Sequence, residues 1–144
     1  MSDEERPDGA AQEEPAPDAP ALSFSRALGT LAAGFLVPGL GHMLLGRIGR
    51  GVAFLLLVLA AVATGVSLEG NLYRVLPGQP LTLLATLGSM GMGLPYFVLR
   101  WAAGYQGDVT AAGYEYGTAF LLTGGLMNLL LLLDVWDISR GRKG

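Results

Sequence analysis

Four long stretches without a charged residue constrain the fold of this chain more than any other feature. They cover residues 27–46, 51–68, 75–99 and 116–133, and hold 20, 18, 25 and 18 residues. A membrane-spanning helix needs about 20 mostly apolar residues, with roughly 17 to 25 workable. A soluble domain of this size has too little interior to bury four such stretches. The sequence therefore predicts an all-α, polytopic membrane bundle of three to four transmembrane helices.

The apolar stretches also indicate where the spans lie. They are continuously apolar, whereas the strands of a membrane barrel alternate with a period of two, so strands are disfavoured. We expect a transmembrane domain over residues 23–144, with approximate spans at 26–46, 51–68, 80–100 and 117–138.

Charge is concentrated at the N-terminus. Residues 1–22 hold seven acids, one base and four prolines, and almost no large apolar side chain. Such a segment buries too little surface to offset its ordering entropy, so we expect a disordered acidic tail. Residues 23–144 carry a net charge of +3 without the basic patch that tracks phosphates, and no nucleic-acid partner is expected.

Cysteine and histidine counts limit the chemistry. The chain has no cysteine and one histidine, His42. Disulfides, thiol catalysis and sites with several histidine ligands are therefore excluded within one chain. We expect no metal, no cofactor and no catalytic residue.

The first apolar stretch contains the sequence Pro38-Gly39-Leu40-Gly41-His42. Proline removes a backbone hydrogen bond and glycine permits unusual dihedral angles, so this junction predicts a helix broken at Pro38-Gly39. Two arrangements remain open. Either residues 24–50 cross the membrane with a kink, or they form a re-entrant hairpin that does not cross.

This junction and the end of the last span resemble a known domain. The residues that carry the likeness are Pro38, Gly39, Gly41, His42, Gly46, Arg47, Gly51 and the pair Trp136-Asp137. Their spacing is similar to the glycine-rich junction of the TM-two domain, and more closely to that of a group of uncharacterised bacterial small membrane proteins. The likeness covers about half of the chain. It implies a membrane protein with a conformationally special turn, and it brings no catalytic residue with it.

His42 and Ser89 are the side chains nearest to catalytic chemistry. His42 could exchange protons near neutral pH, or it could donate to carbonyls freed by Pro38, which is the reading we favour. Ser89 lies in Gly88-Ser89-Met90-Gly91, but a serine nucleophile needs a base and the histidine is 47 residues upstream. We expect Gly88, Gly91, Gly93 and Gly124 to pack helices closely.

Three polar residues lie in the last apolar segment. Asn128 shares a helix face with Gly124, and amides in hydrocarbon bind partners on other helices. Asp134 and Asp137 are one turn apart and precede Arg140, Arg142 and Lys143, which favours local ion pairing. The alternatives for Asp134 are a cation or proton site, or a contact with the junction at His42 and Arg47.

The distribution of basic residues suggests an orientation. With four spans, both termini lie on one side, and so does Arg74. Arg47, Arg50 and Arg100 lie on the other. The excess of basic residues then places the termini in the cytoplasm of a bacterial inner membrane.

Three function classes fit these features. The first and preferred class is a non-enzymatic structural or interaction protein, which associates with membrane lipid and with itself or a larger membrane complex. The second is a transporter or channel component that uses Asn128 and Asp134. The third is a lipid-active enzyme that uses His42 with Asp134 or Asp137.

Overall fold

The computed structural model describes residues 20–142, and this part of the chain is helical, without a strand. Its elements are α1 (Phe24–Leu36), α2 (Leu40–Leu44), α3 (Ile48–Ser67), α4 (Pro80–Met90), α5 (Leu94–Phe97), the π-helical turn η1 (Val98–Ala102) and α6 (Tyr114–Ser139). The predicted all-α class is confirmed for these residues. The expected acidic tail lies outside them apart from residues 20–22, and Lys143 also lies outside.

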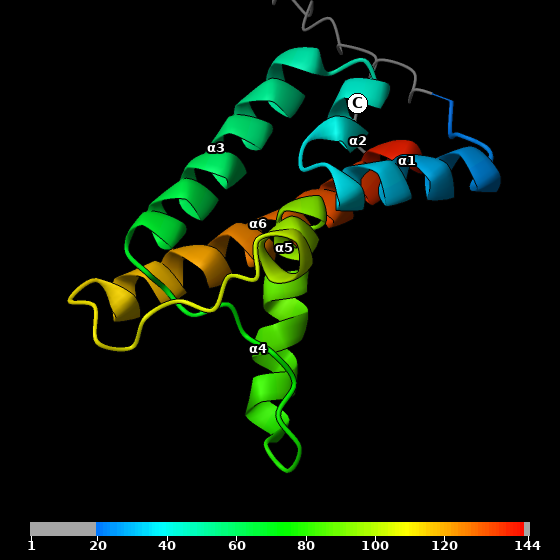
Figure 1. Ribbon diagram of the computed structural model, residues 1–144. Coiled ribbons are helices and arrows are strands. Elements are labelled where there is room, and N and C mark those ends of the chain that lie inside the picture. Colours follow the sequence, from blue (N-terminus) through cyan, green and yellow to red (C-terminus); the bar gives the residue numbers. More distant parts are fainter. Residues whose placement is uncertain (1–19, 143–144) are drawn as a thin grey trace, which may run out of the picture.

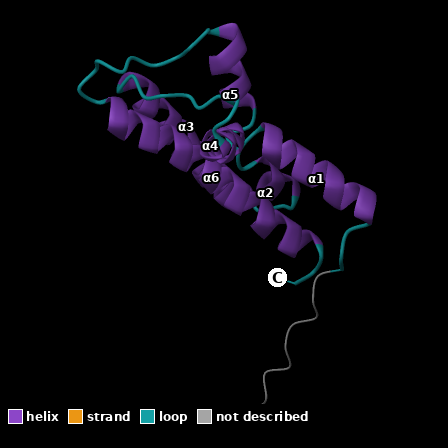
Figure 2. Ribbon diagram, turned by 90° about the horizontal axis from the view of Figure 1, so that it is seen from below, coloured by secondary structure: helices purple, strands orange, loops and turns teal. Residues whose placement is uncertain are grey.

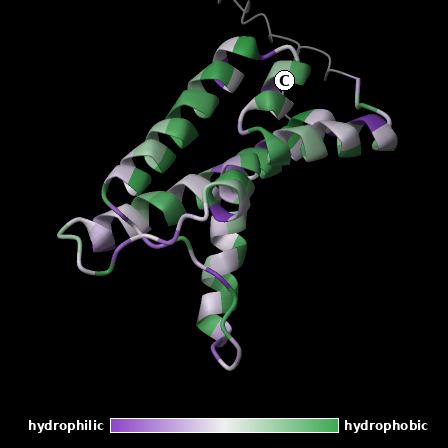
Figure 3. Cartoon of the chain, viewed as in Figure 1, coloured by the Kyte–Doolittle hydropathy of each residue, from purple (hydrophilic) through white to green (hydrophobic). Residues whose placement is uncertain are grey.

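Two of the described helices, α3 and α6, are long and apolar enough to cross a membrane. The pair formed by α4 and α5–η1 would provide a third if it were counted as one span, whereas α1 has 13 residues and is shorter. Figure 3 shows apolar residues along most of α3, with hydrophilic colour near its N-terminal end. The predicted small helical membrane bundle is therefore confirmed.

Helices α3 and α6 form a V that closes at the C-terminal end of α3 (Figure 1). Glycine permits this approach, because a Cβ on Gly65 would lie 2.9 Å from the carbonyl oxygen of Gly117. A Cβ on Gly70 would lie 2.0 Å from the carbonyl carbon of Gly117. The apolar core next to this contact contains Val58, Val62, Leu72, Met92, Tyr96 and Leu121.

Helices α1 and α2 fill the open end of the V. The N–H of Leu22 donates to the carbonyl of Ser139 at 2.9 Å, so α1 starts beside the end of α6. The predicted break at Pro38-Gly39 is confirmed, and the chain reverses there: α2 returns past α1 toward the end from which α1 came. Figure 2 shows α2 next to both α1 and α6. Residues 26–46 therefore form no single helix of spanning length.

Helices α4 and α5 are separated by a sharp bend. Their axes change direction by 115° across residues 91–93. Gly93 has φ +70°, and its N–H donates to the carbonyl of Met90 at 2.9 Å. Helix α4 touches the bundle near this bend, and its other end projects away from it (Figure 1).

The segments 68–79 and 103–113 lie at the same end of the α3–α6 pair. The N–H of Asp108 donates to the carbonyl of Glu69 at 3.0 Å, and the hydroxyl of Tyr105 donates to that of Gly70 at 2.9 Å. The expected placement of these two segments on opposite sides of a membrane is wrong. The chain between the two segments does not form one straight helix, because it bends by 115° at residues 91–93.

Candidate functional site

The junction at Pro38-Gly39 positions the histidine. Gly39 has φ +82°, and a Cβ there would lie 2.1 Å from the carbonyl oxygen of Gly51 in the first turn of α3. A Cβ on Gly41 would lie 2.9 Å from a methyl group of Val135 in α6. These glycines allow the short helix α2 to sit directly against α3 and α6, with His42 facing inward.

His42 is fully buried and bonded to Asp134. Its Nε2 lies 3.0 Å from Oδ2 of Asp134, which is 92 residues away in the sequence. The partner of this imidazole is therefore a carboxylate on α6, and not a carbonyl freed by Pro38 as the sequence predicts. Of the alternatives for Asp134, the one that the structure shows is a contact with the junction, through His42.

The surroundings of the pair decide its chemistry. The edge of the His42 ring meets the ring of Phe54 at a centroid distance of 5.1 Å, and within residues 20–142 its Nδ1 has no hydrogen-bond partner. The Asp134 side chain is 32% exposed, whereas the imidazole is fully buried. The arrangement links α2 to α6 through a buried imidazole and a partly exposed carboxylate.

Asn128 forms a second buried polar centre at the middle of α6. Its Nδ2 donates to the carbonyl of Gly91 at 2.9 Å, and to those of Gly34 and Phe35 at 3.3 and 3.4 Å. The C-terminal ends of α1 and α4 therefore meet at one amide. Ser89 is also fully buried, and neither its Oγ nor the Oδ1 of Asn128 has a partner in the described part of the chain.

The predicted packing glycines differ in how closely their neighbours approach. A Cβ on Gly91 would lie 2.5 Å from the carbonyl oxygen of Gly125, and one on Gly93 would lie 1.8 Å from that of Phe35. A Cβ on Gly88 would meet the Leu122 side chain at 2.9 Å. Gly124 has ordinary space, with a nearest contact of 3.5 Å. Helix α4 and residues 91–93 can therefore lie this close to α6 and α1 because glycine has no side chain at these positions.

The remaining predicted residues lie near the end of α6 and around the α2–α3 turn. Asp137 pairs with Nη1 of Arg142 at 3.8 Å, which is the expected local ion pair. Gly46 has φ +79° and turns the chain into α3, and Arg47 precedes the first residue of that helix. The N–H of Arg47 donates to the carbonyl of His42 at 2.9 Å, which ties this turn to the histidine.

Two residues at these centres were missed from the sequence. Gly125 has less space for a side chain than Gly124, because a Cβ on Gly125 would lie 2.0 Å from the carbonyl oxygen of Gly88. The adjacent glycine pair was a signal, but the choice between its members depends on helix rotation. Phe54 gave no signal, because one aromatic residue in an apolar helix is common. No group of three possible metal ligands occurs within residues 20–142.

The comparisons with known proteins give one match. Residues 29–144 match a family described as a family of unknown function, DUF6677. This match covers far more than half of the chain, and includes both polar centres and every described helix except the first turn of α1. No curated protein and no solved structure matches the chain.

Proposed function

The chain belongs to DUF6677, a family of unknown function, and from that premise we propose that it is a non-enzymatic membrane protein that acts by binding other membrane components. The observation that carries the proposal is that the buried side chains of His42 and Asn128 form hydrogen bonds between helices. His42 is bonded to Asp134, and the amide of Asn128 is bonded to three backbone carbonyls. These groups join helices, and a fully buried imidazole gives a substrate no direct approach.

Helix α4 is the surface that we propose for binding. It has 11 residues, and its buried residues, Thr86, Gly88 and Ser89, belong to its C-terminal half. Leu81 is 78% exposed and Leu84 is 66% exposed. In a bilayer such a helix can contact lipid, but it can also pack against a helix of a second copy or of a larger membrane complex.

Basic residues support an orientation of the proposed inner-membrane protein. Five described arginines lie at the end of the bundle where α3 begins and α6 ends, and two lie at the opposite end. The five are Arg26, Arg47, Arg50, Arg140 and Arg142, and the two are Arg74 and Arg100. Because short cytoplasmic segments carry the excess of arginine and lysine, we assign the first end to the cytoplasm. The likeness of the junction to that of uncharacterised bacterial small membrane proteins supports a bacterial source.

Cross-linking tests the proposed binding surface. The chain has no native cysteine, so Leu84→Cys introduces a single thiol on α4. We expect a photoactivatable cross-linker attached to this thiol to give a covalent dimer or a larger adduct on a gel when it is activated in native membranes. Leu130→Cys on α6 is the matched control, because both leucines are 66% exposed. Equal adducts at both positions, or none at residue 84, would refute a specific role for α4.

A transporter or channel component is the second candidate. The C-terminal ends of α1 and α4 carry partial negative charge, and both meet at Asn128, an arrangement that transporters use for cations. Cation flux into liposomes that is lost in Asn128→Leu, with the protein still folded, would favour this function. A lipid-active enzyme is the third candidate, because a paired histidine and aspartate could act on a lipid. Lipid turnover in membranes that contain the protein would reveal this activity.

A further inference from the structure

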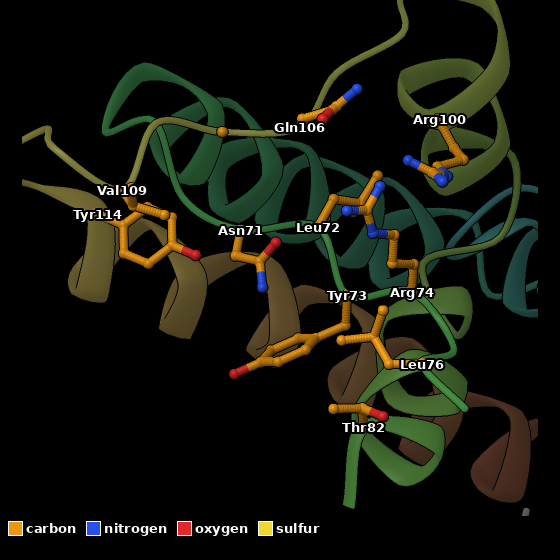
Figure 4. A pocket seen from close by; sticks show the side chains of 11 residues that line it. Asn71, Leu72, Tyr73, Arg74, Leu76, Thr82, Arg100, Gln106, Val109 and Tyr114 are labelled. Atoms are coloured by element: carbon orange, nitrogen blue, oxygen red, sulfur yellow. The ribbon is translucent and has the colours of Figure 1, made fainter. Parts of the chain in front are cut away.

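A hollow of about 310 Å³ lies at the end of the bundle opposite to His42. It is formed by the segment after α3, the start of α4, the end of η1 and the loop before α6. Its lining consists of Asn71, Leu72, Tyr73, Arg74, Leu76, Thr82, Arg100, Gln106, Gly107, Val109 and Tyr114. Figure 4 shows the guanidinium groups of Arg74 and Arg100 turned toward each other across the hollow.

Hydrogen bonds between side chains and the backbone fix the wall of this hollow. The hydroxyl of Tyr96 donates to the carbonyl of Tyr73 at 3.0 Å, and that of Tyr105 donates to Gly70 at 2.9 Å. The N–H of Asn71 donates to Oγ1 of Thr118 at 2.8 Å. Burial raises the pKa of the Tyr105 phenol, so this group remains a donor at neutral pH. The wall is therefore built before any ligand arrives.

The charge inside the hollow is uncompensated. Neither Arg74 nor Arg100 forms an ion pair within the part of the chain that the structure describes, and none of the lining residues is acidic. The nearby carboxylate of Asp108 instead accepts bonds from the N–H and the hydroxyl of Thr110, at 2.9 and 2.7 Å. Two guanidinium groups that share one hollow repel each other unless an anion lies between them.

We propose that this hollow binds a phosphate group. A phosphate offers several acceptor oxygens and negative charge, and arginine binds it through paired, charge-assisted hydrogen bonds. Asn71, Gln106 and Tyr114 add polar side chains to the lining. The shared chemistry fits the head group of an anionic phospholipid or a soluble phosphate ester.

The position of the hollow brings it near lipid head groups. It adjoins the C-terminal end of α3 and the N-terminal end of α6, the two helices that are long enough to cross a membrane. Trp101, which follows Arg100, is 76% exposed. Tryptophan and tyrosine concentrate at head-group depth, so a lipid phosphate can reach the two arginines from the bilayer.

Native mass spectrometry of the purified chain in a phosphate-free detergent tests the proposal. The probes are phosphatidylglycerol, a diacylglycerol with the same acyl chains, and inorganic phosphate. We expect one retained phosphatidylglycerol, no retained diacylglycerol, and about tenfold weaker lipid binding in Arg74→Gln and in Arg100→Gln. The control Arg47→Gln/Arg50→Gln removes charge at the other end and should bind as the unmodified chain does.

The probes also separate the two sources of phosphate. If inorganic phosphate binds and displaces the lipid, the hollow takes a soluble phosphate; if it does not, the hollow takes the lipid head group. Arg100→Lys keeps the charge but loses the planar pair of donors, so we expect intermediate binding. Equal lipid retention by the unmodified chain and both glutamine variants, equal loss in the control, or equal binding of diacylglycerol would overturn the proposal. Melting curves of each variant confirm that the chain is folded.

Discussion

Asp134 is bonded to a fully buried imidazole, while its own side chain is partly exposed. Substitutions at residue 134 can therefore compare the loss of the hydrogen bond with the loss of the charge alone. We predict that Asp134→Leu lowers the free energy of unfolding by about 1–3 kcal/mol, because His42 Nε2 is then buried without a partner. Asp134→Asn retains an acceptor and should lose less. Thermal or denaturant unfolding in detergent measures both.

The matched control for this residue pair is Asp137→Leu. Asp137 lies one turn away, but its bond to Arg142 is 3.8 Å long and exposed, and such pairs contribute about 0–1 kcal/mol. A loss at Asp137 as large as that at Asp134 would show that the histidine contact is unimportant for stability.

The sequence identifies His42 and Asp134 as separate candidates but leaves their pairing open. The two residues are 92 positions apart, and the contact exists because the chain reverses at Gly39 and returns α2 to the end of α6. Proline and glycine predict a break in the helix, but they do not determine the angle of the break. Contacts that depend on that angle become visible in the three-dimensional structure.

At the scale of elements, the crossing of α4 and α6 gives a sharp comparison between adjacent glycines. A Cβ at Gly125 would lie 2.0 Å from the carbonyl oxygen of Gly88, whereas the nearest atom to a Cβ at Gly124 would be the Cβ of Ala61, at 3.5 Å. We predict that Gly125→Ala destabilises the protein by about 1–3 kcal/mol, because backbone must move. Gly124→Ala should be neutral or stabilising, since alanine favours the helix by up to about 1 kcal/mol.

Melting temperatures of the two alanine variants in the same detergent provide this measurement. If Gly125→Ala melts at the temperature of Gly124→Ala, helix α4 does not pack on α6 as described.

The length of an apolar stretch predicts a helix better than it predicts the path of that helix. Residues 51–68 and 117–138 were expected as spans, and α3 and α6 cover them almost completely. The stretch at 80–100 instead bends by 115° at Gly91–Gly93. Its glycines were interpreted as packing positions, because the sequence alone does not distinguish a glycine needed for contact from one needed for a turn.

For the whole molecule, the contact between residues 69 and 108 makes a prediction about membrane topology. Val75→Cys and Val109→Cys should react with an impermeant thiol reagent from one side, and Ile48→Cys from the other. All three native side chains are exposed, so burial does not limit the reaction. Labelling of intact cells and of inverted vesicles distinguishes the sides. Opposite labelling of residues 75 and 109 would contradict the fold.

The position of α6 at the end of the described chain has a consequence for biogenesis. Its Asn128 holds the ends of α1 and α4, which precede it by 94 and 37 residues. During synthesis both earlier helices leave the ribosome before their partner exists, and contacts between distant residues form slowly. Until α6 emerges, the ends of α1 and α4 lack this shared contact. In that interval their apolar surfaces are open to insertion factors, chaperones and proteases.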